Sequence, residues 1–78
     1  MKIISSDHAK LKIRQRKLSQ KRIIETIEKP DSVMLSRGGR EIALKKFRTN
    51  HMQVIIKREY TVIVVVTAHW VASPRKAA

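Results

Sequence analysis

The reactive side chains of this sequence are mostly histidine, lysine and arginine. The chain has three histidines, His8, His51 and His69, and 18 lysines and arginines against six acidic residues. Imidazole accepts and donates protons near neutral pH, and cationic side chains stabilise the negative charge that builds up when a phosphate group reacts. The acidic residues form no cluster and no His-Glu-x-x-His spacing is present, so we expect neither a metal site nor a cofactor.

One set of these residues has helical spacing. His8, Lys12 and Arg16 follow one another at intervals of four residues, which places them on one face of a helix. This stripe fits a phosphate-binding face on which His8 acts as an acid or a base. It also fits a solvated basic helix surface, and the spacing alone favours that simpler interpretation over catalysis by His8.

The net charge of +12 on 78 residues indicates a polyanionic partner. RNA or a ribosome is the first expectation, an anionic membrane surface or another acidic partner is the second, and a highly charged surface without a ligand is the third. The longest apolar run, residues 62–66, is far shorter than the ~20 residues that span a bilayer, and the chain has no cysteine. We therefore expect a cytoplasmic protein that does not bind a membrane, with one domain over residues 1–70 and a flexible tail over residues 71–78.

The first half of the chain has the pattern of two short helices. Residues 7–16 contain neither glycine nor proline and follow a run of capping residues, Ser5-Ser6-Asp7. A second helix is expected over residues 20–28, with Ser19 as its cap and Pro30 as its stop signal.

The second half has the pattern of strands. Strands are predicted over residues 33–37, 40–47, 53–58 and 61–69, and Gly38-Gly39 is a strong hairpin signal because glycine accepts positive φ angles. Residues 1–4 are expected to add a short edge strand. The predicted fold class is α+β, with two N-terminal helices packed on one face of a four-stranded antiparallel meander sheet.

Side chains alternate between the two faces of a strand, so the sequence also predicts the faces of this sheet. The face covered by the helices is expected to hold Ile42, Leu44, Val54, Ile56, Val62, Val64 and Val66. The open face is expected to hold Lys45, Gln53, Ile55, Lys57, Ile63, Val65, Thr67 and His69. Because the open face mixes apolar and cationic groups, it is predicted to be a binding surface, although a dimer or a covering tail would also account for it.

Residues 8–18, His-Ala-Lys-Leu-Lys-Ile-Arg-Gln-Arg-Lys-Leu, resemble the opening motif of a widespread family of small prokaryotic domains. The resemblance extends from about residue 6 to residue 70 and implies a fold like that of RelE-, ParE- and BrnT-type toxins, several of which cleave RNA without a metal. Three residues depart from the family's pattern. Lys12 stands where arginine is usual, Lys17 where glycine is usual and His69 where an aromatic residue is usual. Lys17 is therefore expected to adopt a left-handed backbone conformation.

The leading hypothesis is an RNA-binding, metal-independent endoribonuclease of the toxin–antitoxin type, whose acidic or amphipathic antitoxin-like partner covers the open face. A non-catalytic nucleic-acid-binding module and a small regulatory protein-interaction domain are the alternatives. The predicted catalytic residues are Lys45, Lys57, His69 and His8. The predicted nucleic-acid-binding residues are Lys12, Arg16, Arg37, Arg40, Lys46, Arg48 and Arg58.

Overall fold

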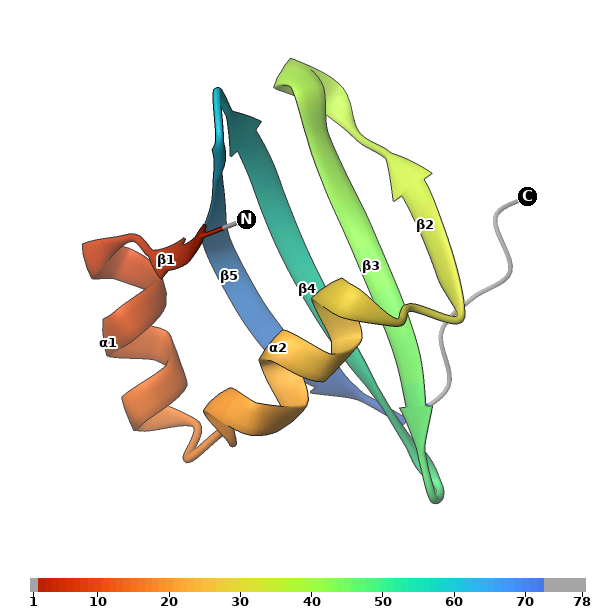
Figure 1. Cartoon of the computed structure of the whole chain (residues 1–78). Coiled ribbons are helices and arrows are strands. Elements are labelled where there is room, and N and C mark those ends of the chain that lie inside the picture. Colours follow the sequence, from red (N-terminus) through yellow and green to blue (C-terminus); the bar gives the residue numbers. More distant parts are fainter. Residues whose placement is uncertain (1, 73–78) are drawn as a thin grey trace.

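The computed structural model describes residues 2–72, which form two helices and a five-stranded sheet (Figure 1). In chain order the elements are β1 (Lys2–Ser5), α1 (Asp7–Gln15), α2 (Gln20–Glu28), β2 (Ser32–Leu35), a 3₁₀ turn (Arg37–Gly39), β3 (Arg40–Phe47), β4 (Asn50–Glu59) and β5 (Val62–Val71). The predicted tail lies outside the described residues, apart from Val71 at the end of β5 and Ala72.

The sheet corrects the predicted RelE-like architecture. Its strand order is β1-β5-β4-β3-β2, and β1 runs parallel to β5, so the sheet is mixed and the prediction of a four-stranded antiparallel meander was wrong. The meander accounts for β2 to β5 only. The missing relationship joins residues about 60 positions apart, such as Ile3 and Ile63. Local alternation in the sequence carries no information about which distant strands pair or in which direction.

Both helices begin at the serines that the sequence predicts. The Ser6 hydroxyl accepts a hydrogen bond from the Ala9 amide at 3.1 Å, and the Ser19 hydroxyl accepts one from the Arg22 amide at 3.4 Å. These bonds satisfy backbone donors that have no partner within the helix. No helix within residues 2–72 is long and apolar enough to cross a membrane.

The end of α1 confirms the expected left-handed residue. Lys17 has a φ of 52°. The amide of Leu18 donates to the carbonyl of Ile13 at 3.0 Å, and the amide of Lys17 donates to the carbonyl of Arg14 at 3.2 Å. This pair of bonds is the Schellman arrangement, which normally uses glycine at the left-handed position. Leu18 and Ile13 are both buried, so the motif also contributes apolar contacts to the core.

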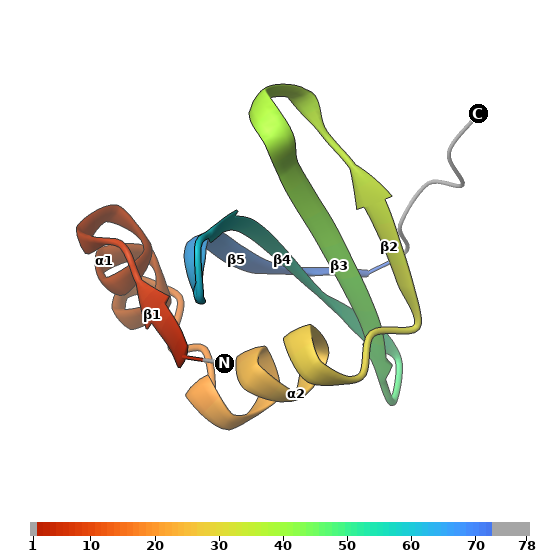
Figure 2. The same ribbon diagram turned by 45° about the horizontal axis from the view of Figure 1, so that its top comes forward.

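One hydrophobic core lies between the two helices and one face of the sheet, with the helices on the same side (Figure 2). Thr26 of α2 is the buried polar residue of this layer, and its hydroxyl donates to the Arg22 carbonyl at 2.7 Å. The core consists of Ala9, Ile13, Leu18, Ile23, Ile27, Met52, Val54, Ile56, Ile63, Val65 and Ala68.

Trp70 closes one end of this core. Its ring packs edge-on against Phe47 with 5.9 Å between centroids, and the Arg22 guanidinium lies over both rings, at 5.8 Å from Trp70 and 5.2 Å from Phe47. Both rings pack against the core cluster on the covered side of the sheet. Trp70 is therefore a packing residue and does not present its face to a ligand.

The strand register changes the predicted faces on β3. Directly paired residues share a face of the sheet. Ala43 pairs with buried Val54, which places Ile42 and Leu44 on the open face and Lys45 on the covered face. The prediction for β3 was therefore off by one residue, because an eight-residue strand with apolar groups on both faces does not specify its own orientation.

A bulge changes the predicted faces on β5. Ile56 pairs with Val65 but Ile55 pairs with Thr67, so Val66 is an extra residue in β5. Before the bulge, Ile63 and Val65 face the helices, opposite to the prediction, while Val62 and Val64 lie on the open face. After it, Thr67 and His69 lie on the open face as predicted. Because of the bulge, β5 buries Val65 on the covered face and places His69 on the open face, although both residues have odd numbers.

Candidate functional site

The open face of the sheet is organised in rows of residues that pair across β3, β4 and β5. One row consists of Lys46, His51 and Val71, and the next consists of Leu44, Gln53 and His69. A third row consists of Ile42, Ile55 and Thr67. We call the group formed by His51, Gln53, Thr67 and His69, together with Lys46, the open-face site.

Two of the three histidines meet in the open-face site. His69 pairs with Gln53, and His51 is two residues before Gln53 on the same face of β4, so the two histidines are diagonal neighbours. Diagonal neighbours on adjacent antiparallel strands lie about 7 Å apart, with side chains able to reach a common ligand. Both side chains are partly buried, and Nδ1 of His51 is buried without a hydrogen-bond partner among the described residues. Since most buried polar atoms have a hydrogen-bond partner, this unpaired nitrogen makes His51 a candidate for proton transfer or ligand binding.

Arg16 reaches the open-face site from the helix layer. Nη1 of Arg16 donates to the Ala68 carbonyl at 2.8 Å and lies 3.5 Å from the Thr67 hydroxyl. The guanidinium therefore lies along the edge of β5, beyond Val65, the last residue that pairs with β1. Burial and then the positive charge of Arg16 lower the pKa of His69 below its usual 6.5. His69 is consequently neutral at neutral pH, the state that a general base requires.

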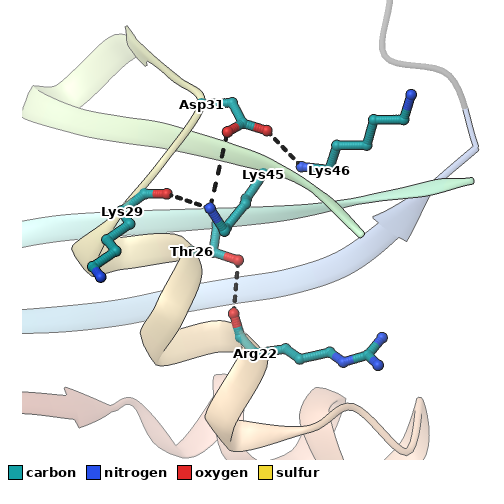
Figure 3. A network of polar contacts seen from close by, with 6 residues as sticks. All are labelled: Arg22, Thr26, Lys29, Asp31, Lys45 and Lys46. Carbon is teal, nitrogen blue, oxygen red and sulfur yellow. Dashed lines mark hydrogen bonds and ion pairs between the residues drawn. The ribbon is translucent and has the colours of Figure 1, made fainter. Parts of the chain in front are cut away.

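Lys45 is on the other side of the sheet and already has partners. Its ammonium donates to the Lys29 carbonyl at 2.9 Å, just after α2, and lies 3.9 Å from Oδ1 of Asp31 (Figure 3). Oδ2 of Asp31 accepts a hydrogen bond from the Lys46 amide at 2.8 Å. Lys45 therefore stabilises the junction between α2 and the sheet, and the structure does not bring it to His69.

Lys57 shares the open face with His69 but not its neighbourhood. Lys57 pairs with Arg40 and Val64, four residues along β4 from Gln53. At about 3.4 Å per residue this separates the Lys57 and His69 rows by about 14 Å. Lys57 also lies 3.8 Å from the carboxylate of Glu59, and both side chains are about half exposed. Its position suits a contact with a distant part of an extended ligand.

His8 and Lys12 stay on α1. His8 is exposed in the first turn, eight residues before Arg16, which corresponds to about 12 Å along a helix. Lys12 is partly buried on the same helix. Of the predicted stripe, the structure brings only Arg16 to the open-face site.

The other predicted nucleic-acid-binding residues divide between the sheet faces and the hairpin turns. Lys46 and Arg40 are exposed on the open face, while Arg37 and Arg48 are exposed in the turns before β3 and after it. Arg58 lies on the covered face, where its Nε donates to Oε2 of Glu41 at 2.7 Å. The open face and its two hairpin ends therefore carry most of the predicted phosphate contacts.

His51 is the member of the open-face site that the sequence interpretation missed. The strand predicted from the sequence begins at residue 53 and leaves His51 out, whereas β4 begins one residue before His51, at Asn50. The signal was present in the alternation of His51, Gln53, Ile55 and Lys57, which share a face once the strand is extended toward its N-terminus. Strand ends are hard to place because Asn50 is itself a turn-forming residue.

Among residues 2–72, no three or more His, Cys, Asp or Glu side chains are grouped so that they could hold a metal ion. Compared with known proteins, the chain matches no family model, no curated protein and no solved structure.

Proposed function

We propose that the protein binds single-stranded RNA on the open face of its sheet and cleaves it without a metal, using His51 and His69 as an acid–base pair. The observation that carries this proposal is the diagonal placement of the two histidines across β4 and β5. About 7 Å between such positions leaves room for one phosphodiester group between the two imidazoles. The +12 charge supports RNA as the substrate class.

The proposed reaction uses the ribose itself as the nucleophile. His69, neutral because burial and Arg16 lower its pKa, accepts the proton of the 2′-hydroxyl as that oxygen forms a bond to the adjacent phosphorus. The bond between phosphorus and the 5′-oxygen breaks, and His51 gives its proton to that leaving oxygen. The products are a 2′,3′-cyclic phosphate and a 5′-hydroxyl end, and the protons are balanced between the two imidazoles.

Two cations would stabilise the negative charge on the phosphoryl oxygens in the transition state. Lys46 pairs directly with His51, and Arg16 is held beside His69 by its bond to Ala68. Fixed positive groups next to the reacting phosphate supply much of the rate in metal-free phosphate chemistry. Arg40 and Lys57 would bind backbone phosphates farther along the bound RNA.

The test is incubation of fluorescent RNA oligonucleotides with the pure protein in EDTA, and separately of translating ribosomes with the pure protein in a magnesium buffer, because ribosomes dissociate without magnesium. Cleavage that yields 2′,3′-cyclic phosphate ends and stops when the scissile 2′-hydroxyl is replaced by hydrogen supports the proposal. His51→Ala and His69→Ala are each expected to slow cleavage by about 10²–10⁴-fold, while His8→Ala has no effect.

Two outcomes would contradict the proposal. Tight binding with no cleavage of RNA in either setting would make the protein a non-catalytic nucleic-acid-binding module. Cleavage that survives both histidine substitutions would place the reaction elsewhere. Whether or not the protein cleaves RNA, a plot of log affinity against log salt concentration should have a slope of magnitude at least ~3. Each phosphate of a single strand that the protein neutralises contributes about 0.7 to this slope.

A further inference from the structure

A hollow of about 530 Å³ is lined by residues of β1, α1 and α2 and lies on the opposite side of the sheet from the open-face site. Its lining includes Ile13, Leu18 and Ile23, which belong to the core. Ile24 extends the apolar lining toward solvent and is 40% exposed. The volume is within the range of about 300–1,000 Å³ that is typical of ligand sites.

Three cations border this apolar hollow. Lys10 and Arg14 are one turn apart on α1, and Lys17 follows just after that helix, so the row extends for about 10 Å. All three are exposed. Within residues 2–72 their side chains make no hydrogen bond or ion pair, and no acidic residue lines the hollow.

The shape of this surface selects among anionic ligands. A single carboxylate or phosphate head would need donors that converge on one point, whereas these three cations are spread along a line. A nucleic acid would place phosphates along the row but would leave Ile24 and the apolar lining without a matching surface. An amphipathic helix satisfies both features, because apolar residues and acidic residues can lie on adjacent faces at spacings of three and four.

We propose that the hollow between α1, α2 and β1 docks an acidic amphipathic helix of a protein partner. Apolar side chains of the partner would occupy the hollow beside Ile24, and its carboxylates would pair with Lys10, Arg14 and Lys17. The partner would leave the open face of the sheet accessible, because the helices that border the hollow lie on the other side of the sheet (Figure 2). This docking site does not depend on the proposed RNA cleavage.

The experiment is a selection from a displayed library of 16-residue helical peptides that carry leucine at helical spacing and Glu, Lys, Ser or Ala elsewhere. The full chain is the target, and selected peptides are measured by fluorescence anisotropy. Acidic peptides should be enriched. Arg14→Glu and Ile24→Asp change exposed positions, and each should weaken the affinity of the chain for the acidic peptides at least about tenfold. Lys21→Glu changes an exposed position on α2 outside the hollow. It changes the net charge by the same amount as Arg14→Glu and should weaken the peptide affinity less than about threefold.

Several results would overturn the proposal. These are the absence of enriched peptides, enrichment without acidic residues, and equal losses from Arg14→Glu and Lys21→Glu. Methyl resonances of Ile3 and Ile24 provide a further readout, because both residues line the hollow. If an RNA oligonucleotide shifts these resonances and the selected peptide does not, the hollow is a nucleic-acid site.

Discussion

Nη1 of Arg16, at the end of α1, donates a 2.8 Å hydrogen bond to the carbonyl oxygen of Ala68 in β5. The two residues are 52 positions apart. The bond occupies a carbonyl on the part of the β5 edge that β1 does not cover, and it holds a positive charge next to His69. One contact thus connects the helix layer to the edge of the sheet and to the protonation of a candidate base.

Arg16→Met should raise the pKa of His69. The methionine keeps most of the aliphatic side chain but removes the charge that contributes to the lowered pKa, while burial, the larger cause, still holds the value below 6.5. NMR titration of the His69 ring measures this directly. The lost bond to the Ala68 carbonyl should also cost about 1 kcal/mol of unfolding free energy, a figure discounted for solvent exposure. An unchanged His69 titration would show that the Arg16 charge does not act on this ring.

His69 should make stability depend on pH in the acidic range. Because its folded-state pKa is below the unfolded value of 6.5, the unfolded chain binds more protons between these two values. The stability linked to neutral His69 is therefore complete above pH 6.5 and is lost as the pH falls through the folded-state pKa. Urea unfolding at several pH values, for the native chain and His69→Gln, isolates this contribution. The native chain should lose more unfolding free energy than His69→Gln as the pH is lowered. Parallel curves of unfolding free energy against pH for the two proteins would contradict the prediction.

Lys17→Gly should stabilise the fold. Lys17 has a φ of 52°, where a side chain with a Cβ is strained by about 1–2 kcal/mol. The greater entropy of glycine in the unfolded chain offsets part of this gain, which leaves about 0.5–1 kcal/mol. Lys17→Ala is the matched control, since it removes the same charge but keeps the Cβ and should give no gain. Urea unfolding that ranks alanine equal to glycine would refute the strain at this position.

Asp31→Ala should destabilise the junction between α2 and the sheet. The carboxylate accepts a hydrogen bond from the Lys46 amide at 2.8 Å and lies 3.9 Å from the Lys45 ammonium, so its removal should cost about 1 kcal/mol. Asp31→Asn retains an acceptor for the amide and should lose less. If both variants unfold at the same urea concentration, the contact with the Lys46 amide is not the stabilising element.

Charge reversal should show whether RNA binding is local. Lys46→Glu combined with Lys57→Glu changes two cations of the open face, while Lys21→Glu combined with Lys29→Glu changes two exposed cations of the helix layer. Net charge changes equally in both double variants, so any difference reflects position and not long-range attraction. RNA affinity, measured by filter binding at fixed salt, should fall at least about tenfold further for the open-face pair. Equal losses would indicate diffuse electrostatics without a defined site.

Signals confined to a few neighbouring residues predicted the local structure of this protein well. The serines at positions 6 and 19 begin the helices, Pro30 follows the second helix, and Lys17 takes the left-handed conformation expected of it. Gly38 and Gly39, at φ values of 74° and 73°, form the turn between β2 and β3. Each of these outcomes depends on backbone sterics or on a hydrogen bond within one turn of chain, so the residues that cause it are adjacent in sequence.

The open-face site, in contrast, depends on relationships that only the tertiary structure decides. The register of β3 moves Lys45 to the covered face, the extra residue Val66 puts His69 opposite Gln53, and the early start of β4 brings His51 beside them. A one-residue change in register exchanges the two faces of a strand, because side chains alternate with a period of two. The sequence contained the histidines and the cations, but packing against the helices determined which of them share a surface.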